Sequence, residues 1–222
     1  MNTTVFRRSF LIVGLASLIV VIGVLLAQAV RQPETTTQTD AAALRFWRAV
    51  RVEAVEAFRY DSLEEIIGAS DVVVLGAIEG VKLGREVRDL AAEETGVSRD
   101  IASTYFAEAD IRVDRILRGR LSPEDGGRIR LDLLLPAPQV APEIQALVPQ
   151  PRAVFFLRDM DRFYGRAELV GLYQLTSLQG VLRDAGGFVA TPEARTERFL
   201  AELQGQPFDA LLQRISAPVP AN

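Results

Sequence analysis

An almost unbroken apolar run near the N-terminus, residues 10–27, constrains this chain more than any other feature of its sequence. Ser17 is the one polar residue within the run, so a helix formed by it would be apolar on every face. Eighteen helical residues rise about 27 Å, close to the thickness of a bilayer's hydrocarbon core. We therefore predict a transmembrane helix over residues 10–29. The alternative, a helix buried in a protein core, is disfavoured by the position of the run at the extreme N-terminus.

Two arginines set the predicted orientation of this helix. Arg7 and Arg8 precede the run, and positive charges beside a membrane helix stay on the cytoplasmic side. Residues 1–9 are thus predicted to be cytoplasmic, and everything after residue 30 extracytoplasmic. The large apolar side chains of the predicted anchor are Phe10, Leu11, Ile12, Val13, Leu15, Leu18, Ile19, Val20, Val21, Ile22, Val24, Leu25 and Leu26.

Retention of the helix is our first prediction, and cleavage is the alternative. Ala27 and Ala29 match the small-x-small pattern of a signal-peptidase site, and cleavage near Ala29 would give a secreted protein. The apolar run is longer than the usual core of a cleaved signal, about 7–15 residues, which favours a retained signal anchor. Arg7 and Arg8 also fit a twin-arginine signal, so the export route stays open.

The chain of 222 residues contains no histidine and no cysteine. Ser-His-Asp and Cys-His nucleophiles, zinc sites with imidazole or thiolate ligands, and disulfides are therefore excluded. The net charge is −4, and −6 once Arg7 and Arg8, the only charges before residue 31, are set aside. An acidic surface disfavours nucleic acid and argues against a polybasic membrane patch. We expect no cofactor, no metal and no nucleic-acid partner.

Polar and apolar patterning divides the rest of the chain. Residues 30–40 are polar and predict a flexible stalk, with Asp40 as the N-cap of the next helix. Residues 41–60 predict an amphipathic helix, which either packs on the domain or lies on the membrane, and we favour packing. Helices are predicted again over residues 191–216, before a tail of residues 217–222.

Residues 61–190 carry the predicted strands. Apolar and polar side chains alternate in several stretches, for example over residues 107–114 and 128–135. Residues 84–103 are polar and predict a long connection with one helical turn. The order of these segments predicts an α+β domain, a small barrel of five or six strands with flanking helices.

The order of the strand motifs resembles two groups of known domains. The motifs are ASDVVVLGAIEGV, ADIRVDRILRGRL, AVFFLRD, and LYQLTSLQG with GFV. They resemble uncharacterised bacterial exported domains over residues 61–215, and netrin-like modules of tissue inhibitors of metalloproteinases over residues 70–190. The second resemblance implies a five-stranded OB-type barrel. It does not imply protease inhibition, because those inhibitors chelate the protease metal through an N-terminal cysteine that this chain lacks.

Three short motifs suggest chemistry that their context does not support. Asp159 and Asp161 resemble the start of a calcium-binding loop, but Phe163 and Tyr164 stand where that loop needs an oxygen ligand and a glycine. Asp184, in a sequence loosely similar to an aspartic-protease motif, is predicted to lie in a hairpin turn. The only lysine, Lys82, is predicted to be exposed and so unsuited to act as a catalytic base. No catalytic residue is therefore predicted.

Six arginines cluster around one predicted hairpin. They either bind an anion or a cell-wall polymer, or pair across strands with Asp110, Asp114 and Asp132, and we favour the pairing. The six are Arg112, Arg115, Arg118, Arg120, Arg128 and Arg130.

These observations together predict a membrane-tethered, extracytoplasmic, non-catalytic binding module. Its partner would be an envelope protein or polymer. One alternative is an envelope hydrolase that uses carboxylates alone, which would show two facing carboxylates about 5–9 Å apart in a cleft. The other alternative is a structural subunit whose Trp47 helix packs against another membrane protein.

Overall fold

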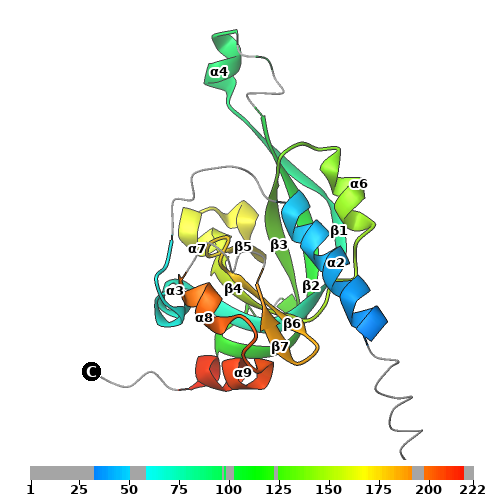
Figure 1. Cartoon of the computed structure of the whole chain (residues 1–222). Helices are drawn as coiled ribbons and strands as arrows, with labels where there is room; N and C mark the ends of the chain where they lie inside the picture. The colour runs from blue at the N-terminus through cyan, green and yellow to red at the C-terminus, as the bar shows by residue number, and fades with distance from the viewer. Residues whose placement is uncertain are drawn as a thin grey trace, which may run out of the picture. The chain divides into compact units, whose positions relative to one another are not determined.

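The computed structural model describes residues 33–50, 59–96, 98, 103–122, 125–191 and 198–217 (Figure 1). The chain forms two compact units, Met1–Thr39 and Asp40–Asn222. The predicted anchor, with Arg7, Arg8, Ala27 and Ala29, lies outside the described residues. Among the residues that are described, no helix combines the length and the apolar character needed to span a bilayer.

Helix α2 spans Pro33–Ala49 and therefore begins within the segment that the sequence assigned to a stalk. Proline suits the first turn of a helix, where its missing N–H group would have no partner. Asp40 consequently lies inside the helix and is not its N-cap. Phe46 and Trp47 of α2 are buried in an apolar cluster of the domain, so this part of the helix packs on the domain. The predicted continuation over residues 51–58 lies outside the described residues.

In the described part of the chain, seven strands form one mixed sheet in the order β1-β2-β3-β5-β4-β6-β7. Strand β4 also pairs with β1, so that β1, β2, β3, β5 and β4 form a closed circuit of paired strands. The β3–β5 pairing is parallel and the others are antiparallel. This sheet and its helices confirm the predicted α+β class, but the sheet has seven strands where five or six were predicted. The strands are β1 (Val72–Arg88), β2 (Ser103–Gly119), β3 (Arg128–Leu135), β4 (Ala153–Asp159), β5 (Leu172–Leu175), β6 (Val181–Ala185) and β7 (Phe188–Ala190).

Strand β1 is buried on both faces at its start, because each face meets a different apolar cluster. Val72 and Val74 belong to one cluster, and Val73 and Leu75 belong to the other. Successive residues of a strand point to opposite faces, and β-branched side chains pack well on such a surface. Helices α2 and α6 (Val140–Gln145) contribute to the first cluster. Helices α3 (Leu63–Ala69), α8 (Arg198–Leu203) and α9 (Phe208–Ser216) contribute to the second (Figure 1).

Strands β1 and β2 extend further than the sequence predicted. They pair as far as Arg88 and Ser103, within the segment predicted as a connection. Helix α4 (Leu90–Glu94) follows at the tip of this hairpin, at the end away from α9 (Figure 1). The connection between the paired strands is therefore limited to residues 89–102. Helix α4 within it agrees with the helical turn predicted there.

Candidate functional site

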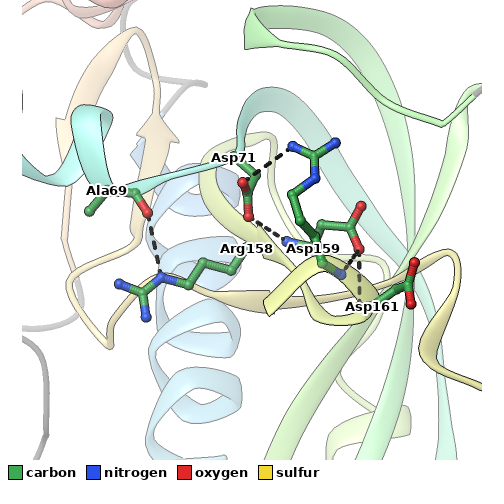
Figure 2. Close-up of polar contacts among 6 residues, drawn as sticks. Ala69, Asp71, Arg158, Asp159 and Asp161 are labelled. Carbon is green, nitrogen blue, oxygen red and sulfur yellow. Dashed lines mark hydrogen bonds and ion pairs between the residues drawn. The ribbon is translucent and has the colours of Figure 1, made fainter. Parts of the chain in front are cut away.

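The aspartates that suggested calcium serve instead to fix a short helix, α7 (Met160–Tyr164). Asp159 Oδ1 accepts hydrogen bonds from the N–H groups of Asp161 at 3.1 Å and Arg162 at 3.4 Å. Asp71 Oδ2 accepts from the Asp159 N–H at 3.0 Å, which ties α7 to the residue before β1 (Figure 2). These carboxylate oxygens are occupied by protein donors, and no cluster of three acidic residues in the described chain could hold a metal ion.

Arg158, the residue before Asp159, links the start of helix α7 to neighbouring parts of the domain. Its side chain is buried, and its Nη2 donates to Tyr60 Oη at 2.7 Å. Its Nε donates to the Ala69 carbonyl at 3.4 Å (Figure 2). The guanidinium also lies 5.0 Å from the centroid of the Phe163 ring, within cation–π range. Met160 is buried in a small apolar cluster beside it. The connection from β4 to β5, residues 160–171, is therefore anchored at its base, and we call it the α7 loop.

The α7 loop nevertheless exposes apolar side chains. Phe163 is 46% exposed and Tyr164 52%, and their rings meet edge to face with centroids 4.9 Å apart. Val170, at the other end of the loop, is 40% exposed. No binding role was predicted for these residues from the sequence, although two adjacent aromatic residues in a charged turn were the available signal. The loop thus presents an aromatic pair on a fixed support.

Acidic and basic side chains pair on the outer surface of β1, β2 and β3. Lys82 Nζ lies 2.5 Å from Glu108 Oε1, and Arg130 Nη1 lies 3.5 Å from Glu108 Oε2. The hydrogen bond and negative charge of Glu108 raise the pKa of Lys82, whose side chain is exposed as predicted. We call this surface, with its Arg85–Asp132 pair, the paired face. Acidic side chains on the same surface largely neutralise its cations.

Asp132 is the most enclosed charge of the paired face. Its side chain is 3% exposed, and its Oδ2 accepts from Arg85 Nη2 at 2.7 Å and from Arg85 Nε at 3.0 Å. Burial raises the pKa of Asp132, although Arg85 opposes that shift. Asp132 stands directly opposite Glu108 in the β2–β3 register, which makes the two a candidate for the facing carboxylates of the hydrolase alternative. Because the Asp132 carboxylate is covered and bonded to Arg85, it is an internal counter-ion that substrate does not reach.

The six clustered arginines fall into two groups. Three pair with acids, as predicted, but mainly with glutamates that the sequence did not single out. Arg112 Nε lies 2.6 Å and Arg128 Nη2 lies 2.9 Å from Glu79, and Arg112 also bonds to Asp114. Arg130 uses Glu108.

Of the other three arginines, two lie on the second half of β2 and Arg120 follows its last residue. Arg118 Nη1 donates to the Ala217 carbonyl at 3.3 Å. Within the residues that the structure places, Arg115 and Arg120 have no acidic partner, and both are exposed. The pairing interpretation therefore applies to one end of the cluster only.

Two further charged positions are structural. Asp184 Oδ1 accepts from the Gly187 N–H at 2.8 Å, which confirms the predicted hairpin turn between β6 and β7. Arg183, which the sequence did not single out, is buried and its Nη1 donates to Asp40 Oδ1 at 3.2 Å. Desolvation lowers the pKa of Arg183, and Asp40 opposes that shift. This ion pair attaches α2 to β6.

Searches against protein-family models and against curated protein sequences give no match for this chain. Function is therefore argued from the surfaces described above. Two of them are exposed and ordered: the α7 loop with Phe163 and Tyr164, and the arginines of the second half of β2.

Proposed function

We propose that this protein is a membrane-tethered, extracytoplasmic binding module without catalytic activity, and that the α7 loop is its binding surface. The tether is the apolar run of residues 10–27, and Arg7 and Arg8 give the orientation. The partner is an envelope protein or polymer.

We further propose that the domain is a barrel of the OB type, as the netrin-like resemblance implies. Support comes from the pairing series β1–β2–β3–β5–β4–β1 with its parallel β3–β5 contact. Helix α6 lies between β3 and β4 in the chain, and Ile144 of this helix is fully buried in the cluster that β1, β2 and β3 share. In barrels of this kind the β1–β2 and β4–β5 connections take part in ligand binding, and the α7 loop is the β4–β5 connection.

The observation that carries the binding proposal is the exposed aromatic pair on an anchored loop. Aromatic side chains in water forgo the gain of burial, about 25 cal/mol per Å² of apolar surface. Phe163 and Tyr164 are held outward by a helix that Asp159 caps and Arg158 supports. Aromatic residues and arginine are enriched at the centres of binding interfaces, and a preformed loop loses little entropy on binding.

The alternative of a structural subunit, in which the Trp47 helix packs against another membrane protein, is less well supported. Trp47 is 7% exposed, and its ring lies 6.5 Å from that of Phe155 within the domain's own cluster. Little of this side chain is left for a partner.

The test is affinity capture with the full chain in detergent from envelope extracts. We expect a protein or polymer to be retained by the wild type and lost with Phe163→Ala/Tyr164→Ala. The matched control is Phe188→Ala, which removes a ring that is 54% exposed on β7. Equal retention by all three proteins, or no retained species, would contradict the proposal.

The topology is tested separately by a reporter at the C-terminus of the full chain. A reporter that is active only outside the cytoplasm is expected, and activity confined to the cytosol would refute the orientation.

A further inference from the structure

Three arginines of β2 lie on one face of the sheet, although their spacing in the sequence does not suggest it. Arg112, Arg115 and Arg118 follow one another at intervals of three, and a regular strand would turn Arg115 to the opposite face. In the β1–β2 register they stand opposite Ala77, Leu75 and Val73, which are alternate residues of β1.

Two irregularities in the pairing produce this arrangement. Between Arg112 and Arg115, and again between Arg115 and Arg118, three steps along β2 match two steps along β1. Each is a β-bulge, which adds a residue to one strand and redirects the following side chains. The three arginines therefore form a line at intervals of about 7 Å, two residues of a strand. We call them the arginine row.

The surroundings of the row are suited to an anionic partner. Arg115 is exposed and has no acidic partner among the residues that the structure places, and Arg120 beside the row is in the same situation. Ile116, which lies between two members of the row in sequence but stands opposite Val74 and so points to the other face of β2, is 45% exposed. Guanidinium groups bind phosphate oxygens in bidentate fashion, and an exposed apolar side chain on the same strand segment suits an interface between charge and hydrocarbon.

Measured along the sheet, the row also lies near Asp40, where the tether meets the domain, although the residues that link the two points share the face opposite the row. Arg183, Ala153, Gly76 and Val113 stand side by side on β6, β4, β1 and β2. Three strand spacings separate Arg183 from Val113, about 15 Å, and Arg183 is bonded to Asp40 of α2.

Few residues separate this point from the predicted anchor. Only residues 30–39 lie between the anchor and Asp40, and they reach at most about 35 Å if extended. Where α2 is helical, from Pro33 onward, the rise is about 1.5 Å per residue and the reach is shorter. A surface held this close to a bilayer meets it at a high effective concentration.

We propose that the arginine row binds the phosphate groups of anionic lipids in the membrane that anchors the chain, and that this contact fixes the orientation of the domain. The inference rests on the proposed membrane tether. It revises the expectation from net charge, because bulges gather arginines locally on a chain that is acidic overall. Each basic side chain at an anionic surface strengthens binding by about fivefold.

The test uses the full chain in nanodiscs of phosphatidylcholine, with or without phosphatidylglycerol. Because the chain has no cysteine, Ile116→Cys carries a single nitroxide label. We expect phosphatidylglycerol to make the label more accessible to oxygen and less accessible to a water-soluble nickel complex. The control label, Leu90→Cys on α4, replaces a side chain that is 59% exposed and is expected not to respond to the lipid.

Added in the Ile116→Cys background, Arg115→Glu is expected to lower the docked-to-free ratio by fivefold or more. This substitution breaks no ion pair within the described residues, and near-ultraviolet circular dichroism verifies the fold. The inference is overturned if the label at position 116 is indifferent to phosphatidylglycerol or to Arg115→Glu, or if a soluble anionic polysaccharide protects it equally without phosphatidylglycerol. Failure of the chain to insert into nanodiscs would instead refute the tether.

Discussion

The two halves of strand β2 carry similar charges and place them in different environments. From Tyr105 to Arg112, β2 lies between β1 and β3, and Glu108 and Arg112 form ion pairs. From Val113 to Gly119 its described strand partner is β1 alone. The acids of the paired face come from other strands of the sheet, adjacent or one strand further: Glu79 from β1 for Arg112 and Arg128, and Asp132 from β3 for Arg85. A strand with one neighbour has fewer positions from which a counter-ion can reach it.

The comparison shows that the number of neighbouring strands and the register decide what a charged residue does. On the paired face, alternation and cross-strand proximity neutralise arginines that the sequence also presented as an anion site. On the second half of β2, two bulges bring arginines to one face and leave Arg115 exposed. The same residue type is structural in one half and available for binding in the other.

Gly76→Ala should have the largest effect and should separate the two halves. A Cβ at Gly76 would lie 2.4 Å from the Arg112 carbonyl oxygen and 3.0 Å from Ile111 Cγ2, so the strands cannot approach as they do. We expect a loss of about 3 kcal/mol in the free energy of unfolding, as for an overpacked core. Urea denaturation of the full chain in detergent, followed by the fluorescence of the single tryptophan, Trp47, measures it.

The matched control is Gly80→Ala, on the same strand in the paired half. Its Cβ would meet Asp110 side-chain atoms at 3.4 Å or more, an ordinary contact. A change within about 0.5 kcal/mol is expected. Equal losses for both variants would show that the close approach at Gly76 is not what holds the second half of β2.

The periodicity of the sequence predicted which side chains of β2 point into the core, but it did not predict which way the exposed charged side chains point. Alternation over residues 107–113 correctly turned Ala107, Ala109 and Ile111 inward, because a half-buried strand leaves a period of two in its sequence. The bulges beyond Arg112 could not be predicted, since they arise where β1 curves to pair with both β2 and β4. The orientation of Arg115 depends on them.

Local sequence also explains why the α7 loop was recognised only in part. The prediction that the sequence around Asp159 and Asp161 does not match a calcium-binding loop used local chemistry, and the structure places Asp159 as the N-cap of a short helix. The support beneath the turn comes from Asp71 and Tyr60, about 90 to 100 residues earlier in the chain. Contacts of that range leave no local pattern, so the exposed aromatic pair was not identified as a site.

Asp132→Ala should be the next largest change and tests the paired face itself. The substitution leaves Arg85 without the carboxylate that receives two of its hydrogen bonds. Because Arg85 is 35% exposed and water can partly replace that partner, we expect a loss of about 2 kcal/mol, below the range for fully buried pairs. Arg115→Ala, in the other half, should change stability by less than about 0.5 kcal/mol. Similar losses for the two variants in chemical denaturation would remove the distinction between the halves.

The pH dependence of stability should carry the signature of Asp132. Burial raises the pKa of this carboxyl above its ordinary value of 3.8, so the folded protein holds the proton more tightly than the unfolded chain does. Proton binding therefore stabilises the folded state fully below pH 3.8, and this stabilisation is lost as the pH rises from there through the folded-state pKa. Relative to Asp132→Asn, the wild type should therefore lose stability across that window and then level off. A difference that grows with pH would mean that Arg85 outweighs burial.

Glu79→Gln should have the smallest effect on stability and is the sharpest test of what separates the two halves. Glu79 is the shared partner of Arg112 and Arg128, and all three side chains are about one-third exposed or more. Such pairs contribute at most about 1 kcal/mol, so the fold should persist. The substitution removes the negative charge that Arg112 and Arg128 share, while Arg112 keeps its bond to Asp114, and so extends the unneutralised charge into the paired half. With the label at position 116, the docked-to-free ratio on phosphatidylglycerol nanodiscs should rise about fivefold, the gain from removing one acid at an anionic surface. An unchanged ratio would show that pairing with Glu79 does not limit lipid binding, and that the contrast within β2 concerns structure alone.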